Sequence, residues 1–478
     1  FLLRNLLLIV VKNKMEKTRV CLIVDNPLRD LDGLILVSWH LSQMDVDVYL
    51  VPMYVQATDV IAIKPDLVLL NYLRPNNLNL ARKYKSNGIN IGVLDTEGTA
   101  GKDSDEFAQL TSSVGNLDLI DLYCFWGGDQ YKSFVKLNKS IESALKVTGC
   151  PRYDFCNEKL QPILSKISNM GEFVLINTNF PVVNPRFSRG SDNEKEAMLK
   201  AGFESDFADQ YIKDARIAFT SIIEVVENIS NKFQNLNFVL RPHPFENIEA
   251  YAQLAHISNV FLKQEKTSIE WINSAKCLIH LNCSTAVEAS MLGKHSISPE
   301  WLNTPALNVP NPNLVSFHAK NEENLVEMLD LLIKGVRLKG HQKIKESKDE
   351  IVKSLYANND GHSAKRVAEE VIKSINNKKT ITYKASNIFY INRAEVVFYL
   401  RQLLGYKIFS FIRNILKGKE EIAKQEGKYF STNYVKNKLS KIQLCLANKD
   451  NRSVKVEYAS QLNFDKNRSL SNKSIKII

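Results

Sequence analysis

Two carboxylates lie beside a glycine in the segment Asp95-Thr96-Glu97-Gly98, directly after the apolar run INIGVL. A carboxylate that is shielded from water by a facing domain keeps a raised pKa and can take a proton from an attacking hydroxyl group. This pattern predicts that one of the two acids, Asp95 or Glu97, acts as the general base for an acceptor hydroxyl. The alternative is a solvated turn in which one of the two acids caps a helix.

A histidine held between two prolines follows the apolar run NFVL, in the segment Arg241-Pro242-His243-Pro244. Because each proline fixes its own φ angle, the imidazole is held rigidly at the end of the strand. An imidazole in that position can hydrogen-bond a nucleotide base or phosphate, and the neighbouring guanidinium can pair with an anion. The alternative is a structural turn with a solvent-exposed histidine.

Two hydroxyl groups and an acid follow the apolar run AKCLIHL, at Ser284, Thr285 and Glu288. Ser284 can cap the helix that begins with TAVEASML, and Glu288 falls about one turn later. Free N–H groups at the start of a helix, together with hydroxyl groups, bind phosphate. We expect the phosphate of a nucleotide to bind here, and an ordinary N-cap is the alternative.

Further positions are candidates for acceptor or cleft contacts: Asn71 and Arg74 after the run PDLVLL, Gly98 in the acidic motif, and Arg152 near the expected domain junction, where it could contact a phosphate. A plain loop is the alternative at the first two, and a hinge or crossover turn at Arg152. The isolated histidines show neither HExxH nor HxH spacing. We therefore expect no metal that is bound by protein side chains.

The elements that position these residues alternate short apolar runs with longer stretches of helical spacing. Continuous apolar strands separated by helices are typical of a parallel sheet covered by helices on both faces. The pattern occurs twice. It predicts an α/β protein with two doubly wound, Rossmann-like domains at residues 15–160 and 165–378, and a basic helical extension at residues 379–478. Ligands of such sheets bind at the carboxyl ends of the strands, in this case in the cleft between the domains.

The motifs DTEG, VTGCPRYDF, LINTNF, LRPHP and NCSTAVEASMLGKHSIS together resemble those of bacterial surface-carbohydrate biosynthesis proteins with a GT-B glycosyltransferase architecture. More loosely, the chain is similar to enzymes that use CMP-activated sugars, namely bacterial sialyltransferases and capsule Kdo transferases. The resemblance implies that Glu97, with Asp95, is the base, that His243 with its following proline contacts the cytidine nucleotide, and that Ser284 and Thr285 hold its phosphate.

The resemblance extends over residues 18–320. The acidic motif departs from the common pattern of paired acids, because Asp95 lies one position earlier than that pattern requires. The choice between Asp95 and Glu97 therefore stays open, and so does an inverting mechanism. In a retaining enzyme neither acid need be a base.

The charge of the chain is unevenly distributed: 63 Lys and Arg against 52 Asp and Glu give a net +11, and residues 379–478 hold 20 basic and 7 acidic residues. That segment carries a net +13, which leaves residues 1–378 at −2 and argues against a nucleic-acid-binding body. Residues 387–417 combine five basic residues and one acid with apolar residues at helical spacing. This pattern predicts a helix on an anionic membrane surface. A helix packed on the body with its basic side chains extended to water is the alternative.

The opening run FLLRNLLLIVV is too short to span a bilayer, and we expect translation to start at Met15. The seven cysteines form no CxxC pair, and several lie in apolar runs, which is typical of free thiols in a reducing compartment. We therefore expect a cytoplasmic protein that is peripheral at the inner face of the cell membrane.

These patterns together favour an enzyme, a glycosyltransferase of cell-surface polysaccharide biosynthesis. The expected donor is a nucleotide sugar, specifically a CMP-activated ulosonic acid, and the expected acceptor is a glycan or a lipid-linked glycan. Because a CMP leaving group carries a single phosphate, no cofactor or obligatory metal is expected. The alternatives are transfer of a polyol phosphate from a CDP-activated donor, an epimerase of the same architecture, and a non-catalytic, membrane-tethered scaffold of a glycan-assembly complex.

Overall fold

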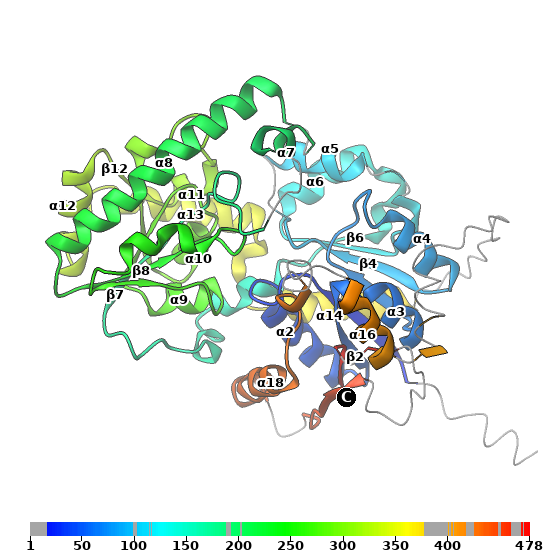
Figure 1. Cartoon of the computed structure of the whole chain (residues 1–478). Coiled ribbons are helices and arrows are strands. Elements are labelled where there is room, and N and C mark those ends of the chain that lie inside the picture. The colour runs from blue at the N-terminus through cyan, green and yellow to red at the C-terminus, as the bar shows by residue number, and fades with distance from the viewer. Residues whose placement is uncertain are drawn as a thin grey trace, which may run out of the picture.

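The computed structural model describes residues 17–98, 103–113, 115, 117–187, 193–200, 203–376, 400, 403–404, 406–416, 425–447, 451–459, 470–471 and 473–478. It forms two α/β lobes, each built around its own sheet (Figure 1). Expectations for the opening run and for residues 379–399 and 417–424 lie outside the described residues. No helix among the described residues combines the length and the apolar character needed to cross a membrane.

The first lobe contains an eight-stranded sheet with the order β13-β14-β2-β1-β3-β4-β5-β6. Six of its strands are parallel: β1 (Arg19–Val24), β2 (Asp47–Pro52), β3 (Leu67–Leu70), β4 (Asn90–Leu94), β5 (Leu122–Phe125) and β6 (Leu145–Val147). The helices around it are α2 (Leu31–Gln43), α3 (Gln56–Ile63), α4 (Leu78–Ser86), α5 (Ser104–Ser112) and α6 (Gly128–Leu137).

The second lobe contains a six-stranded, fully parallel sheet with the order β12-β11-β10-β7-β8-β9. Its strands are β7 (Phe173–Asn177), β8 (Asn237–Arg241), β9 (Val260–Leu262), β10 (Cys277–His280), β11 (His295–Pro299) and β12 (Phe317–Ala319). Its helices are α7 (Glu194–Lys200), α8 (Ser205–Lys232), α9 (Ser268–Ser274), α10 (Thr285–Met291), α11 (Pro310–Leu314), α12 (Glu322–Ile333) and α13 (His341–Leu355).

The continuous apolar runs form these strands because helices cover both faces of each sheet. On β1, alternate side chains enter two different cores: Val20 and Leu22 pack with residues of α2, whereas Cys21 and Ile23 pack with residues of α3 and α4. Helix α2 approaches the 3-10 turn Pro151–Cys156 closely, since a Cβ on Gly33 would lie 2.7 Å from the backbone nitrogen of Arg152. This close packing fixes the loop between β1 and α2 at the carboxyl edge of the sheet.

Helix α14 (Ser363–Asn376) lies within the range expected for the second domain, but it packs on α2 and β5 of the first lobe. The buried carboxylate of Asp154 explains its position, because Asp154 accepts hydrogen bonds from the backbone N–H groups of Ser363 (3.0 Å) and Ala364 (2.8 Å). The chain therefore returns to the first lobe after it has completed the second.

The C-terminal extension is not a separate appendage where the structure describes it. Helix α16 (Tyr406–Leu416) is helical as expected, and α18 (Thr432–Leu446) packs on α2. The strands β13 (Val456–Tyr458) and β14 (Ile475–Ile477) then extend the first sheet, with β14 antiparallel to β2. Apolar side chains explain this, since Ile475 and Ile477 are fully buried. The seven cysteines are free thiols, and Cys445 alone among them is exposed.

Candidate functional site

Arg29, in the loop that follows β1, lies at the centre of the charged residues on the cleft side of the first lobe. Its guanidinium pairs with Asp25 (Nη2–Oδ2 3.0 Å), Asp30 (Nε–Oδ1 2.8 Å) and Glu97 (Nη1–Oε1 3.3 Å). Burial alone would lower the pKa of Arg29, but the carboxylates of Asp30 and Asp25 outweigh it and raise the pKa, so Arg29 stays a cation. Arg29 was not among the residues predicted from the sequence. Its position just after a buried strand is the signal that could have found it.

The two acids of the motif after β4 have different environments. Asp95 is buried and accepts hydrogen bonds from Arg74 (Nη2–Oδ2 3.3 Å), from the backbone N–H of Glu97 (2.9 Å) and from the hydroxyl of Tyr123 (3.4 Å). Burial raises the pKa of Asp95 despite this cation. Glu97 is exposed and pairs with Arg29 instead. Glu97 is therefore the acid of this pair that a substrate can reach.

Arg74 and Asn71 hold the acidic loop. Arg74, expected to contact an acceptor, directs its guanidinium at Asp95. Asn71 is buried, its backbone carbonyl accepts a hydrogen bond from the N–H of Thr96 (2.9 Å), and its amide nitrogen lies 3.9 Å from the sulfur of Met53. The structure thus gives both residues contacts within the first lobe.

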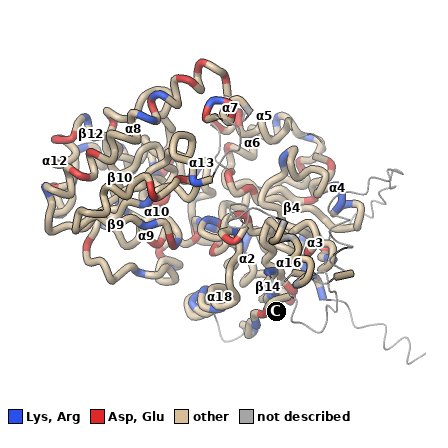
Figure 2. The backbone as a smooth tube through the Cα atoms, in the orientation of Figure 1, with Lys and Arg blue, Asp and Glu red and all other residues tan. Residues whose placement is uncertain are grey.

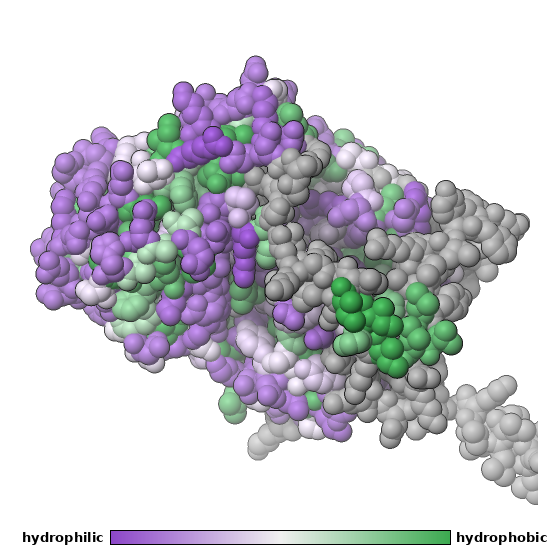
Figure 3. All heavy atoms as spheres, in the orientation of Figure 1, coloured by the Kyte–Doolittle hydropathy of each residue, from purple (hydrophilic) through white to green (hydrophobic). Residues whose placement is uncertain are grey.

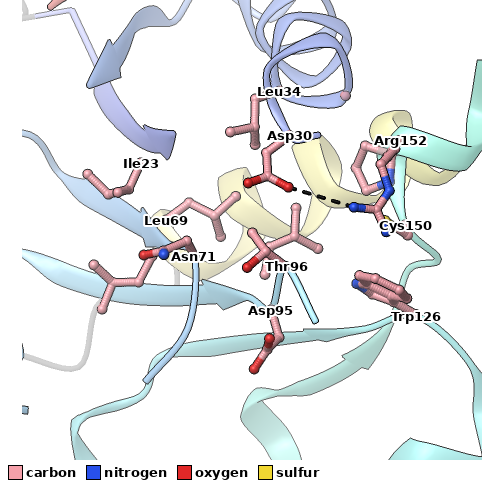
Figure 4. Close-up of a pocket in the computed structure, with 14 residues that line it drawn as sticks. Ile23, Asp30, Leu34, Leu69, Asn71, Asp95, Thr96, Trp126, Cys150 and Arg152 are labelled. Carbon is pink, nitrogen blue, oxygen red and sulfur yellow. Dashed lines mark ion pairs between the residues drawn. The ribbon is translucent and has the colours of Figure 1, made fainter. Parts of the chain in front are cut away.

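A small hollow of about 30 Å³ lies at the carboxyl ends of β1, β3, β4 and β5 (Figure 4). Arg152 reaches its wall, with Nη1 3.8 Å from Oδ1 of Asp30, and its guanidinium lies over the rings of Trp126 (5.3 Å) and Tyr153 (4.7 Å). The Nε of Arg152 is buried with no hydrogen-bond partner. The hollow has room for about two water molecules and is too small for a sugar. Its lining residues therefore pack against the acidic loop and do not bind a substrate.

Gly98 is required by close packing. A Cβ at this position would lie 2.7 Å from the ring of Trp126, and the Gly98 carbonyl accepts a hydrogen bond from Nε2 of Gln130 (2.5 Å). The glycine therefore fixes the acidic loop against the start of α6.

His243, in the second lobe, is held in one tautomer. The backbone N–H of Phe245 donates to its Nδ1 at 3.2 Å, so the proton of the neutral ring lies on Nε2. Burial, with Arg241 and Arg29 nearby, lowers the pKa of His243 to about 4. Since Arg29 belongs to the first lobe, the two lobes approach each other at this histidine. At neutral pH the ring is an uncharged donor.

Glu246 fixes the histidine loop from within. Its Oε1 accepts from the N–H of His243 (3.0 Å) and from the hydroxyl of Thr178 (2.9 Å), and its Oε2 accepts from Tyr251 (2.5 Å). Burial raises the pKa of Glu246. Glu246 was not predicted from the sequence. Its position three residues after the histidine of the motif is the signal that could have found it.

Arg241 is only 5% exposed, and its Nη2 donates to the carbonyl of Lys266 at 3.1 Å. Its Nε is buried without a hydrogen-bond partner, and no ion pair joins it to another described residue. Burial lowers its pKa. The carboxylate of Glu288 acts to raise the pKa of both Arg241 and Arg152, which belong to opposite lobes. Its Oε2 accepts a hydrogen bond from the hydroxyl of Ser268 at 2.7 Å.

The hydroxyl residues after β10 differ from each other. Ser284 is exposed, but its backbone is already helical and its side chain makes no capping hydrogen bond. The hydroxyl of Thr285 accepts from Asn177 (2.9 Å) and donates to the sulfur of Cys283 (3.1 Å). Thr285 is therefore engaged within the lobe, whereas Ser284 is open to a ligand.

A larger hollow, of about 300 Å³, lies between the lobes beside Gly98. Its apolar wall consists of Phe107, Leu314, Ile351 and Leu355, and its polar groups come from both lobes: Asp103, Ser104, Asp129, Gln130, Asn311, Ser347, Glu350 and Ser354. Apolar patches between hydroxyl, amide and carboxylate groups suit a sugar. Among the described residues, no group of three or more His, Cys, Asp or Glu side chains could hold a metal ion.

No protein-family model matches the chain, and no curated protein matches it. Solved structures do match, among them the wall teichoic acid polymerase TagF, at 12% identity and a TM-score of 0.50 over 78% of this chain and 97% of that one. The S. aureus MnaA–UDP structure matches at 13% identity and 0.46, over 75% and 97% of the two chains. A UDP-GlcNAc 2-epimerase from Methanocaldococcus jannaschii, in complex with UDP-GlcNAc and UDP, matches at 12% and 0.45, over 74% and 100%.

At these identities the likeness concerns the fold alone. Two Rossmann-like lobes with parallel sheets form a GT-B architecture, as the sequence predicted. The donor, the acceptor and the roles of the site residues stay predictions.

Proposed function

We propose that a GT-B fold with these cleft residues performs nucleotide-sugar-dependent glycosyl transfer in the synthesis of a cell-surface glycan. One observation carries the proposal: His243, which follows β8, lies near Arg29 of the opposite lobe, whose charge helps to lower its pKa, and Arg29 pairs with Glu97 at 3.3 Å. A nucleotide bound at His243 would place its sugar next to an accessible carboxylate. That is the arrangement a transfer to a hydroxyl group requires.

On the donor side, Nε2–H of His243 donates a hydrogen bond to the phosphate of the nucleotide. The hydroxyl of Ser284 and the buried guanidinium of Arg241, whose Nε has no partner, are the further donors. The proposed donor is a CMP-activated ulosonic acid, which follows from the motif resemblance. A single phosphate needs few cations, and no cofactor is part of the proposal.

On the acceptor side, Glu97 takes the proton of the attacking hydroxyl while the oxygen of that hydroxyl forms a bond to the anomeric carbon. The bond between that carbon and the phosphate oxygen breaks, and CMP leaves as an anion. Arg29, whose Nη1 lies 3.3 Å from Oε1 of Glu97, holds this carboxylate in place before the reaction. The hollow beside Gly98 takes the acceptor glycan.

Transfer of a polyol phosphate from a CDP-activated donor is the second candidate. The fold likeness to a wall teichoic acid polymerase favours it. The same histidine would then contact a diphosphate, and the hydroxyl of the acceptor would attack phosphorus rather than carbon.

Thermal-shift measurements with CMP, CDP, UDP and GDP separate these candidates. Stabilisation by CMP, lost in His243→Ala, supports the first proposal, and a clear preference for CDP supports the second. Stabilisation by UDP alone contradicts both. No response to any of the four favours the non-catalytic scaffold.

The proposed location of this reaction is the inner face of the membrane, to which the protein attaches through α16. Figure 3 shows an apolar patch at this helix, where Ile408, Phe411 and Ile415 are all exposed. The surrounding residues 387–417 hold five basic residues and one acid, which suits an anionic leaflet.

Vesicle sedimentation tests this attachment. Phe411→Ser with Ile415→Ser should abolish binding to vesicles that contain phosphatidylglycerol. Leu444→Ser on α18, which removes another highly exposed apolar side chain, should leave binding unchanged. Equal binding by all three proteins contradicts the attachment.

A further inference from the structure

The C-terminal segment 425–446 contacts both lobes. Figure 1 shows α18 beside α2, and Figure 2 shows basic residues along this helix. Before the helix begins, Lys428 pairs with Asp25 of the first lobe (Nζ–Oδ1 3.0 Å) and lies 5.6 Å from the ring centroid of Phe245 in the second. One stretch of chain thus reaches each side of the cleft.

Lys438 joins the lobes from the buried side of α18. Its Nζ lies 2.7 Å from Oδ2 of Asp32, on α2, and 3.4 Å from Oε1 of Glu270, on α9. The Lys438 side chain is 4% exposed, and Tyr434 donates a second hydrogen bond to Asp32 at 2.7 Å. A buried ammonium is stable only when carboxylates compensate its lost hydration, so this cation requires both lobes to be near.

Neighbouring side chains fit the same arrangement. Val435, Leu439 and Ile442 are buried in the core that continues from the first lobe into the second. Lys441 donates to the hydroxyl of Ser165, in the segment that links the lobes, at 2.8 Å. Helix α18 therefore covers the junction itself.

The far end of the segment connects to the site. Asp25 holds Lys428 through one carboxylate oxygen and Arg29 through the other, with Nη2 at 3.0 Å. The ring of Phe245 packs against that of His243, with centroids 5.6 Å apart. Any change in the separation of the lobes would move these groups relative to each other.

We infer that Lys438 is a positioning residue of the reaction: it holds the two lobes at the separation that brings Arg29 and Glu97 opposite His243. The expected loss of turnover rests on the proposed function. The expected change in the separation of the lobes does not depend on it.

The experiment compares Lys438→Met, Lys438→Arg and the control Lys436→Met, an exposed lysine of the same helix. In Lys438→Met, turnover should fall about tenfold because the reacting groups are misplaced. CMP affinity should change less than twofold, since the proposed nucleotide contacts lie in the second lobe. The radius of gyration from small-angle scattering should increase. Lys438→Arg should restore turnover, and Lys436→Met should match the wild type.

Wild-type turnover and an unchanged radius of gyration in Lys438→Met would overturn the inference. If that variant does not fold, Glu270→Gln replaces it, because it weakens the link to the second lobe and leaves the pair with Asp32 intact. An unchanged radius and turnover in Glu270→Gln would equally overturn the inference. If the wild type binds no nucleotide, the proposed function fails. The scattering comparison still tests whether Lys438 holds the two lobes at their separation.

Discussion

The two faces of the cleft differ in how they use charge. On the first lobe, Arg29 pairs with three carboxylates, and Asp95 pairs with Arg74. On the second lobe, His243 is neutral, Glu246 accepts hydrogen bonds from hydroxyl and backbone donors, and Arg241 makes no ion pair with another described residue. One face therefore presents paired ions, and the other presents oriented dipoles and an unpaired guanidinium.

This difference suits a division of labour. A proton acceptor must be within reach of the attacking hydroxyl and held in place, and Glu97 is exposed and pairs with Arg29. A nucleotide anion must bind and then leave, and the second face offers it the neutral Nε2–H of His243 and the guanidinium of Arg241. Preorganised dipoles also cost no reorganisation during the reaction.

Glu97→Gln is the strongest test of the charged face. Turnover should fall at least about 100-fold because the amide cannot accept the proton, and CMP affinity should change less than twofold. Steady-state kinetics together with nucleotide titration measure both quantities. Glu142→Gln, at an exposed acid of the same lobe, is the control. Full activity in Glu97→Gln would remove this residue from the mechanism.

Asp95→Asn distinguishes the buried acid from the exposed one. The substitution leaves Arg74 without its carboxylate partner, so the free energy of unfolding should fall by about 1–3 kcal/mol. The same measurement on Glu97→Gln should show a change below about 0.5 kcal/mol, since Glu97 is exposed. Urea denaturation decides this. An unchanged free energy of unfolding in Asp95→Asn would show that Asp95 contributes no more to stability than Glu97 does.

His243→Ala tests the neutral face. Loss of one hydrogen bond to the nucleotide should weaken CMP binding about tenfold, which corresponds to roughly 1.4 kcal/mol. His256→Ala, at an exposed histidine of the same lobe, should bind as the wild type does. Equal affinity in all three proteins would place the nucleotide elsewhere.

Much of the fold could be predicted from the sequence, because the parallel strands are continuous apolar runs and their order along the chain implies helices on both faces. The place of α14 and of β14 could not. Both depend on partners far away in the sequence, such as Asp154 for Ser363 and β2 for Ile475. Their local sequence indicates only a helix and a short apolar strand.

The sequence pointed to candidate residues where a motif follows a strand, as at Glu97 and His243, and their roles stay predictions. Arg29 obeys the same rule after β1, but no motif surrounds it. The separate environments of Asp95 and Glu97 depend on Arg74 and Arg29, whose side chains only the folded structure brings near. The ion pairs of Lys438 could not be predicted from the sequence, because the two carboxylates that it contacts belong to different lobes.

The smallest expected effect concerns pH. His243 has its pKa lowered to about 4 in the folded protein, against an ordinary value near 6.5. The folded state therefore disfavours the proton, and the stability that the neutral ring contributes is complete above pH 6.5 and declines as the pH falls toward 4. Between pH 8 and 6.5 the ring stays neutral.

The ratio of the CMP affinities of wild type and His243→Gln should accordingly change less than twofold between pH 8 and 5.5. Taking the ratio cancels the ionisation of the nucleotide itself. An exposed histidine would instead become a cation near pH 6.5 and attract the phosphate, so the ratio would rise severalfold as the pH falls. Such a rise would mean that the second face also charges, and the contrast between the two lobes would then depend on pH.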